Sequence, residues 1–311
     1  MPDIQMRFNK DMLVLSAPLR SVLARQGVDV DQDMEYLTLI EPDALRDTVR
    51  MEKIAGAQCL VAPTEGITPA RLAHKDMAGR EIELALAALS LLRPLKPQHL
   101  IAEIGPCGLP LDGSSADSLN ENRAQYAAAA RAFAGQALDA LLLSGFARPD
   151  DLKCALMGVR QATDIPVFAS VKLDGDGTMP DGRTRVEDAV ALMEEYGAQV
   201  AGFECGASLA QLVAIAQRAA RACSLPLIVQ IAVAHHDRKQ GEPTAENPYY
   251  CPDAVVDAAL ALRASGVQFL RAVGDVSPAY TGALAMAVMG LDVVIPGMAD
   301  AAQDGAGGGE L

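Results

Sequence analysis

Aromatic residues are scarce in this sequence: it has no tryptophan, six phenylalanines and six tyrosines among 311 residues. Half of the residues are nevertheless hydrophobic, which is ample for a large core. That core must therefore be built mainly from Ala, Leu, Val and Ile. Alanine-rich helices packed on aliphatic strands are the arrangement that suits such a composition.

Basic residues are also in short supply, since 26 Lys and Arg stand against 40 Asp and Glu, for a net charge of −14. A surface of this sign repels phosphate backbones and anionic lipid headgroups. We therefore expect neither a nucleic-acid partner nor a membrane partner, and interpret the negative charge mainly as an aid to solubility.

Paired cysteine motifs and long apolar runs are missing too. The six cysteines are scattered without a CxxC spacing, which predicts reduced thiols in a cytoplasmic protein. The first residues have no apolar signal-peptide core, and no uncharged apolar run reaches the ~18 residues that a membrane span needs.

What the sequence does contain is a repeated alternation of short apolar runs with long Ala/Leu-rich segments. The apolar runs lie at 13–18, 58–64, 100–106, 140–146, 167–173, 200–206, 227–234 and 267–274. Several are continuously apolar, as expected of parallel strands covered by helices. The pattern predicts one (β/α)₈ barrel over residues 1–299 and a flexible, Gly-rich tail over 300–311. A doubly wound sheet is the alternative.

The intervening segments have the spacing and composition of helices. We expect helices within 116–137, 185–198, 208–222 and 252–266, several of them ended by a glycine just before the next strand. The segment 235–251 departs from the alternation, and we expect it to be a long polar loop after the seventh strand.

In such barrels the functional face lies at the carboxyl ends of the strands. Polar residues gather there in this sequence and predict a polar cup. Those that we assign to substrate binding are Ser16, Thr64, Glu65, Glu103, Ser144, Gln230 and Asp275. Those that we assign to catalysis are Lys172, Glu204 and Cys205. The eighth strand also brings Arg271 to this face.

Plainer interpretations of the same residues remain open. Lys172 and Glu204 also suit a structural ion pair. Cys205 is a candidate metal thiolate or nucleophile, but equally a small buried hydrophobe. His235 and His236 are adjacent, so their side chains point apart, which favours a solvated loop over a two-histidine metal site.

Several stretches resemble the homocysteine S-methyltransferase family, found in betaine–homocysteine methyltransferase and in the N-terminal part of cobalamin-dependent methionine synthase. The stretches are EPDALRDTVRMEKIAGAQCLVAPTEGITPARLA (41–73), LIAEIGPCG (100–108), 136–171 and VAGFECGASLAQL (200–212). The resemblance implies a barrel in which three cysteine thiolates hold zinc, and zinc lowers the pKa of the acceptor thiol.

The resemblance does not extend to the complete zinc site. The family's first cysteine ligand corresponds to Cys205, but its adjacent Cys-Cys pair falls within Ala272, Val273 and Gly274. The family's Asn before the first ligand is Glu204, and its Glu-Thr after the fourth strand is Ser144-Gly145. A zinc ion would need replacement ligands from His235, His236, Cys251 or Glu204.

The resemblance thus implies a methyltransferase, with altered metal site and substrate, that moves a methyl group to a thiol or related acceptor. The methyl donor is not specified, and a corrinoid protein is one expected source. We expect a small-molecule substrate and a homodimer. Two alternatives remain, namely a barrel that binds a small charged ligand without catalysis, and an enzyme that uses Lys172 as a base or Schiff-base amine.

Overall fold

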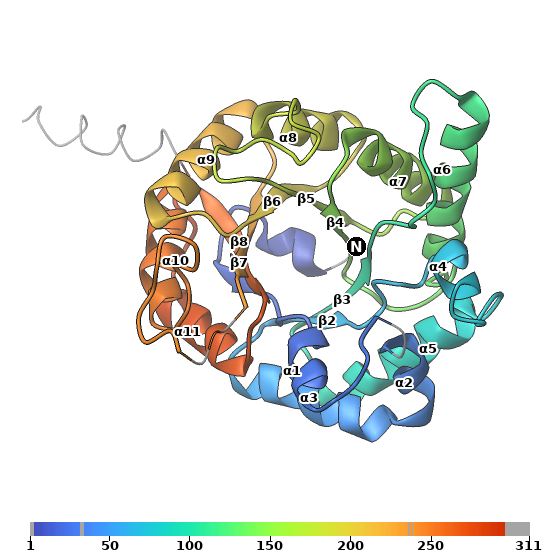
Figure 1. The fold of residues 1–311 in the computed structure, drawn as a ribbon, viewed down its shortest axis with the longest axis horizontal. Coiled ribbons are helices and arrows are strands. Elements are labelled where there is room, and N and C mark those ends of the chain that lie inside the picture. The colour runs from blue at the N-terminus through green and yellow to red at the C-terminus, as the bar shows by residue number, and fades with distance from the viewer. Residues whose placement is uncertain (1–2, 32–33, 236, 238, 296–311) are drawn as a thin grey trace, which may run out of the picture.

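Eight parallel strands form the centre of the computed structural model, which describes residues 3–31, 34–235, 237 and 239–295 (Figure 1). The strands are β1 (Leu13–Val14), β2 (Cys59–Ala62), β3 (His99–Ile104), β4 (Ala140–Phe146), β5 (Val167–Lys172), β6 (Val200–Cys205), β7 (Leu227–Val233) and β8 (Val267–Gly274). They lie in the order β1-β8-β7-β6-β5-β4-β3-β2.

The sheet closes between its first two strands. Leu15, just past β1, bridges Cys59 in parallel. The amide of Ser16 donates to the Cys59 carbonyl over 2.9 Å, and the amide of Gln58 donates to the Val14 carbonyl over 3.0 Å. The predicted single (β/α)₈ barrel is therefore confirmed, and the doubly wound alternative is excluded. The predicted tail at 300–311 lies outside the described residues.

Helices surround the strands as a ring (Figure 1). They are α1 (Arg20–Arg25), α2 (Met34–Ile40), α3 (Pro42–Ile54), α4 (Pro69–Ala73), α5 (Glu81–Leu92), α6 (Ala116–Arg131), α7 (Pro149–Ala162), α8 (Val186–Glu195), α9 (Leu209–Ala222), α10 (Ala254–Ala264) and α11 (Pro278–Val288), with a 3-10 turn, η2 (Arg93–Leu95), after α5. Among the described residues, none of these helices has the length and apolarity to cross a bilayer.

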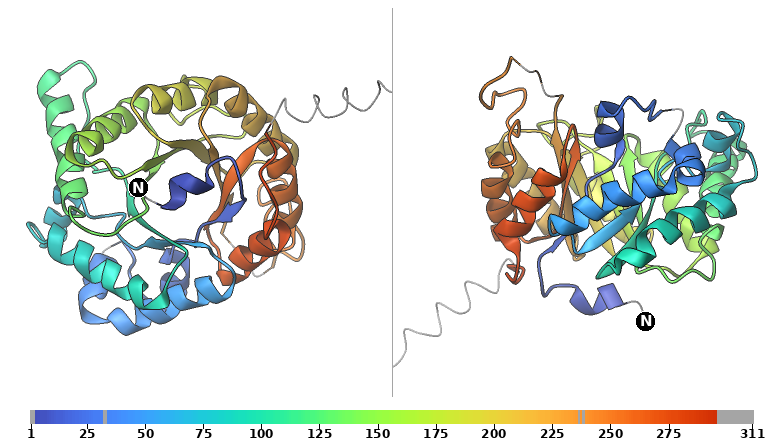
Figure 2. Two further views of the ribbon diagram at one scale, coloured as in Figure 1. Left: turned by 180° about the vertical axis from the view of Figure 1, so that it is seen from behind. Right: turned by 90° about the horizontal axis from the view of Figure 1, so that it is seen from below.

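The amino-terminal end of the barrel is covered by a short 3-10 helix, η1 (Asp3–Arg7), which lies across the opening in Figure 2. Ile4 is fully buried inside the barrel, and the Phe8 ring lies 6.1 Å from the rings of both Phe168 and Phe269. The side-chain amide of Gln268 donates to the carbonyl of Arg7, the last residue of η1, and to that of Asp11 just beyond it. The segment thus closes one end with apolar contacts and hydrogen bonds.

Two apolar layers follow from the alternation of side chains along each strand. One layer fills the barrel interior with residues such as Phe168, Val200 and Ile228. The other fills the space between strands and helices, and it includes Phe203 and Cys205. Interior positions of β6 therefore lie one residue before or after the helix-facing ones, which determines which strand-end residues reach the cup.

A close approach between α6 and α7 gives a first prediction. A Cβ atom added at Gly158 of α7 would lie 2.4 Å from the backbone oxygen of Arg123 on α6. Replacing Gly158 by alanine should lower the free energy of unfolding by about 1–3 kcal/mol, although alanine favours helix, because α6 and α7 must move apart. Urea unfolding measures this loss. Gly241→Ala is the control, since no atom lies within 4 Å of its added Cβ, and equal effects of both substitutions would contradict the prediction.

Candidate functional site

Four polar side chains form a row across adjacent strands at the carboxyl end of the barrel. Strand register pairs Lys172 of β5 with Glu204 of β6, Glu204 with Gln230 of β7, and Gln230 with Arg271 of β8. Because paired residues of neighbouring strands point to the same face of a sheet, all four side chains point into the barrel. The row is the polar wall of the site.

This row lines an open cup of about 340 Å³. The lining residues are Pro18, Arg20, Glu65, Glu103, Ser144, Gly145, Lys172, Glu204, Gln230, Arg271, Val273 and Gly274. A cavity of this volume suits a small molecule. The structure thus brings together seven of the residues predicted from strand ends, namely Glu65, Glu103, Ser144, Lys172, Glu204, Gln230 and Arg271.

Arg271 is the most buried charge of the cup, with 1% of its surface exposed. Its guanidinium donates two parallel hydrogen bonds to the Glu103 carboxylate, over 2.8 and 2.9 Å. A third bond, from Nε to the Ser16 carbonyl, measures 2.9 Å. Burial alone would disfavour the cation, and the Glu103 charge overcomes this and raises the pKa of Arg271. The Arg271–Glu103 pair is therefore fixed and has no net charge. We call this pair, together with Gln230, the floor of the cup.

Gln230 extends this floor toward β4 and β5. Its side-chain oxygen accepts from Arg271 over 3.2 Å. Its side-chain nitrogen donates to the hydroxyl oxygens of Ser144 and Ser170 over 2.9 and 2.8 Å. Gln230 and Ser170 are fully buried. The amide therefore has all its partners inside the protein, and only Ser144 of the two serines lines the cup.

Glu204 and Lys172 are the charged groups of the row that are not held by other side chains. Within the described residues, neither makes a hydrogen bond or an ion pair with another side chain. Burial raises the pKa of Glu204, and the nearby Lys172 charge opposes that rise only in part. The structural ion pair that was one interpretation of these residues is thus not formed, and both groups are free to meet a ligand.

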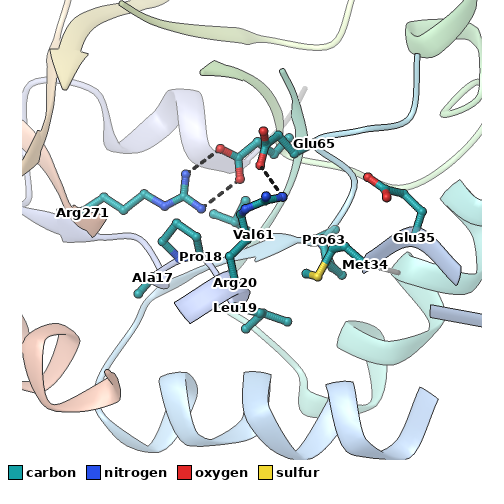
Figure 3. Close-up of a pocket in the computed structure, with 12 residues that line it drawn as sticks. Ala17, Pro18, Leu19, Arg20, Met34, Glu35, Val61, Pro63, Glu65 and Arg271 are labelled. Carbon is teal, nitrogen blue, oxygen red and sulfur yellow. Dashed lines mark hydrogen bonds and ion pairs between the residues drawn. The ribbon is translucent and has the colours of Figure 1, made fainter. Parts of the chain in front are cut away.

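A narrow recess continues from the cup toward β1, β2 and α2 (Figure 3). It holds about 20 Å³, and apolar side chains such as Leu19, Met34 and Val61 form much of its wall. Glu65 stands at its edge, where Arg71 contacts one carboxylate oxygen over 3.3 Å and Arg20 contacts the other over 3.9 Å. The recess has room for a group about the size of one water molecule.

Three of the predicted substrate-binding residues lie beside the cup without lining it. The Ser16 hydroxyl accepts from the Val61 amide, and the Thr64 hydroxyl bonds both the amide and the carbonyl of Glu103. These two side chains hold neighbouring strands together. Asp275 pairs instead with Arg25 and with His235. Ser16 and Thr64 can therefore support the cup by fixing its strands, while Asp275 binds an adjoining loop.

Cys205 lies in the layer between strands and helices, on the opposite side of β6 from Glu204. Its sulfur accepts from the Ala207 amide over 3.4 Å and lies 3.6 Å from the Asp174 carbonyl oxygen. Burial raises the pKa of its thiol, which favours the protonated form. The sulfur therefore faces a buried loop rather than the cup.

The described residues do not fit a tetrahedral zinc site. In the described part of the chain, no group of three or more His, Cys, Asp or Glu side chains is placed to hold a metal ion. The resemblance sets its cysteine pair within Ala272, Val273 and Gly274, of which Val273 and Gly274 line the cup but bring no ligand atom in their side chains. Cys251 lies in the 235–251 loop, no described residue of which lines the cup, and His236 is outside the described residues.

Arg20 and Pro18 line the cup although the sequence analysis did not single them out. Arg20 begins α1, six positions past β1, and Pro18 precedes it in the same loop. A search for polar residues at the carboxyl ends of the predicted strands does not find them, because no spacing or motif distinguishes them from other loop residues. The basic character of Arg20 and Arg71 around Glu65 therefore becomes apparent only once β1, β2 and their loops are packed together.

Comparison with known proteins bears on the family and on the fold. The profile described as homocysteine S-methyltransferase matches residues 13–274. A search of curated protein sequences finds no match.

Solved structures with the same fold include the homocysteine methyltransferase MmuM from Escherichia coli. Its oxidized form has a TM-score of 0.73 at 18% identity, over 89% of this chain and 96% of that one. Its metallated form has a TM-score of 0.71 at 18% identity, over 88% of this chain and 95% of that one. The carboxyl transferase domain of Rhizobium etli pyruvate carboxylase has a TM-score of 0.54 at 13% identity, over 92% of this chain and 44% of that one. At these sequence identities, the similarity establishes a shared fold only.

Proposed function

We propose a methyl-transfer function for this chain, which belongs to the homocysteine S-methyltransferase family. The acceptor is a small thiol, or a related nucleophile, that binds in the cup. The observation that carries the proposal is the pair of Lys172 and Glu204, two charged groups on adjacent strands that line the cup and have no partner among the described side chains. Such groups are suited to bind and deprotonate a polar substrate.

In the proposed reaction Glu204 takes up the proton of the acceptor thiol. The acceptor sulfur forms a bond to the methyl carbon of the donor, and the bond between methyl and leaving group breaks with its electron pair on the leaving group. A carboxylate whose pKa is raised by burial is a better base near neutral pH than an exposed one. Lys172 stabilises the negative charge of the substrate beside it.

The chemistry of the cup supports some methyl donors over others. Quaternary ammonium groups are typically bound in cages of aromatic rings. The described residues that line the cup and the recess include no Phe, Tyr or Trp. A methyl sulfonium or a methylcorrinoid carried by a partner protein is therefore the donor class we propose.

The test is a direct assay of methyl transfer. Protein would be incubated with homocysteine and, in turn, a methyl sulfonium, a quaternary methylammonium and a methylcorrinoid, each labelled with ¹³C on the methyl group. We expect a labelled thioether, detected by NMR, from one of the first or third donors. Absence of transfer to homocysteine and to other small thiols from all three would overturn the proposal and favour a barrel that binds a ligand without catalysis.

The position of Cys205 yields a prediction about metal. Since its sulfur faces away from the cup, Cys205→Ala should leave the zinc content unchanged and alter methyl transfer by less than about threefold, with a stability loss of about 1 kcal/mol for a small buried side chain. Elemental analysis of reduced, tag-free protein measures the metal. Near-stoichiometric zinc that disappears in the variant would contradict the prediction and restore a metal to the mechanism.

A further inference from the structure

We propose that Ser144 and Lys172 form a subsite for the carboxylate group of the ligand, at the carboxyl ends of β4 and β5. The inference rests on the proposed function only in taking the cup as the substrate site. It adds the chemical class of one end of the substrate and the two side chains that recognise it.

The direction of the hydrogen bonds in the floor determines what Ser144 can offer. Arginine can only donate, so the Gln230 atom that faces Arg271 must be the amide oxygen. The amide nitrogen then donates to the hydroxyl oxygens of both Ser144 and Ser170. Ser144 is therefore an acceptor toward Gln230, and its own proton has no acceptor among the described residues. That proton is available to a ligand in the cup, because Ser144 lines it.

Lys172 supplies a positive charge beside this hydroxyl. The strand β4 has an irregularity between Leu143 and Phe146, so that Ser144 and Gly145 have no register partner on β5. Gly145 adopts a φ of +85°, and a Cβ atom added there would be 4.0 Å from Cε of Lys172. The stem of Lys172 thus runs close past the backbone that carries Ser144. An ammonium group and a hydroxyl donor are set on adjoining strands at one side of the cup.

The remaining charges favour a carboxylate over other anions. Arg271 is neutralised by Glu103, and Arg20 already contacts Glu65. Lys172 is therefore the one cup cation with no side-chain partner among the described residues. Glu204 lies beside it in the sheet register, so a phosphate dianion would meet about twice the repulsion that a singly charged carboxylate meets. One cation and one hydroxyl match the two oxygens of a carboxylate.

The test compares two small thiols that differ in the charge of their second group. Ligand-observed NMR titrations of reduced protein would use 3-mercaptopropionate, which carries a carboxylate, and cysteamine, which carries an ammonium group. Inorganic phosphate is a third probe. We expect 3-mercaptopropionate to bind tightest. Lys172→Met should weaken its binding about tenfold to a hundredfold, and Ser144→Ala about threefold to tenfold. Lys172→Arg keeps the charge and should retain the preference for the carboxylate.

Several outcomes would overturn the subsite. They are tighter binding of cysteamine or phosphate, no carboxylate-dependent binding in the wild-type protein, or unchanged carboxylate binding in both Lys172→Met and Ser144→Ala. Thermal unfolding of each variant verifies that it is folded, which the exposure of Lys172 favours. Because binding is measured without turnover, an inactive protein that retains the preference would refute methyl transfer alone. An active protein without the preference would refute the subsite alone.

Discussion

Replacing Arg271 by methionine should lower the free energy of unfolding by about 3–5 kcal/mol, because Glu103 would be left as a buried carboxylate without its partner. The same substitution removes the bonds that hold Gln230 and the Ser16 carbonyl. The loss would be measured by urea unfolding with circular dichroism, and by the thermal midpoint. It would be among the largest effects available from a single substitution in this chain.

Two further variants separate the charge effect from the loss of an arginine side chain. Arg50→Met, on an exposed face of α3, should change stability by less than about 0.5 kcal/mol. The double variant Arg271→Met with Glu103→Met should be more stable than Arg271→Met alone, because it removes both buried charges. If the double variant lost as much free energy of unfolding as the two single variants together, the loss in Arg271→Met would not come from the unpaired charge of Glu103, and our inference would be wrong.

The second large effect concerns catalysis. Glu204→Gln should reduce kcat/KM for methyl transfer by about 10²–10⁴-fold, since the amide cannot take up the acceptor's proton. The hydrogen bonds among Arg271, Glu103 and Gln230 should be unaffected, because Glu204 makes no hydrogen bond to another side chain among the described residues. Initial rates with the ¹³C-labelled donor measure the loss. Glu195→Gln, on the exposed face of α8, is the matched control and should retain full activity.

Stability should move in the opposite direction from activity in this variant. Burial raises the pKa of Glu204 in the folded protein above its value in the unfolded chain, so the ionised form destabilises the fold at a pH above the folded-state pKa. There, Glu204→Gln should be at least as stable as the wild type. As the pH falls through the folded-state pKa, the wild-type carboxyl takes up its proton and the advantage of the variant should shrink. An inactive variant that is also less stable at neutral pH would point to a structural role instead.

Much of the fold could be predicted from the spacing of apolar residues. The runs at 140–146 and 267–274 coincide with β4 and β8, because both strands are covered on both sides and each is preceded by a polar residue or a glycine. The run at 13–18 was too long, since only Leu13–Val14 is a strand. From Ser16 onward the backbone bonds side chains of other elements, including Arg271 and Glu52, which no local pattern reveals.

The site was less accessible from the sequence, for two physical reasons. The first is pairing over distance, since Arg271 and Glu103 are 168 positions apart and nothing local links them. The second is the alternation of side chains between the two faces of a strand. Glu204 and Cys205 are neighbours on β6, so only one of them can face the cup, and the structure places Glu204 there. The family pattern drew attention to Cys205, whereas the alternation of interior residues in β6 already favoured Glu204.

The cover that η1 places over the amino-terminal end of the barrel has a kinetic consequence. Because apolar side chains fill the barrel interior and Ile4 and Phe8 pack against them at that end, reactants and products must pass through the same opening at the carboxyl ends of the strands. Of two reactants, the one that binds deeper must then arrive first and its product must leave last. A single opening thus imposes an order on binding and release. A product that dissociates slowly occupies this opening and competes directly with the next substrate.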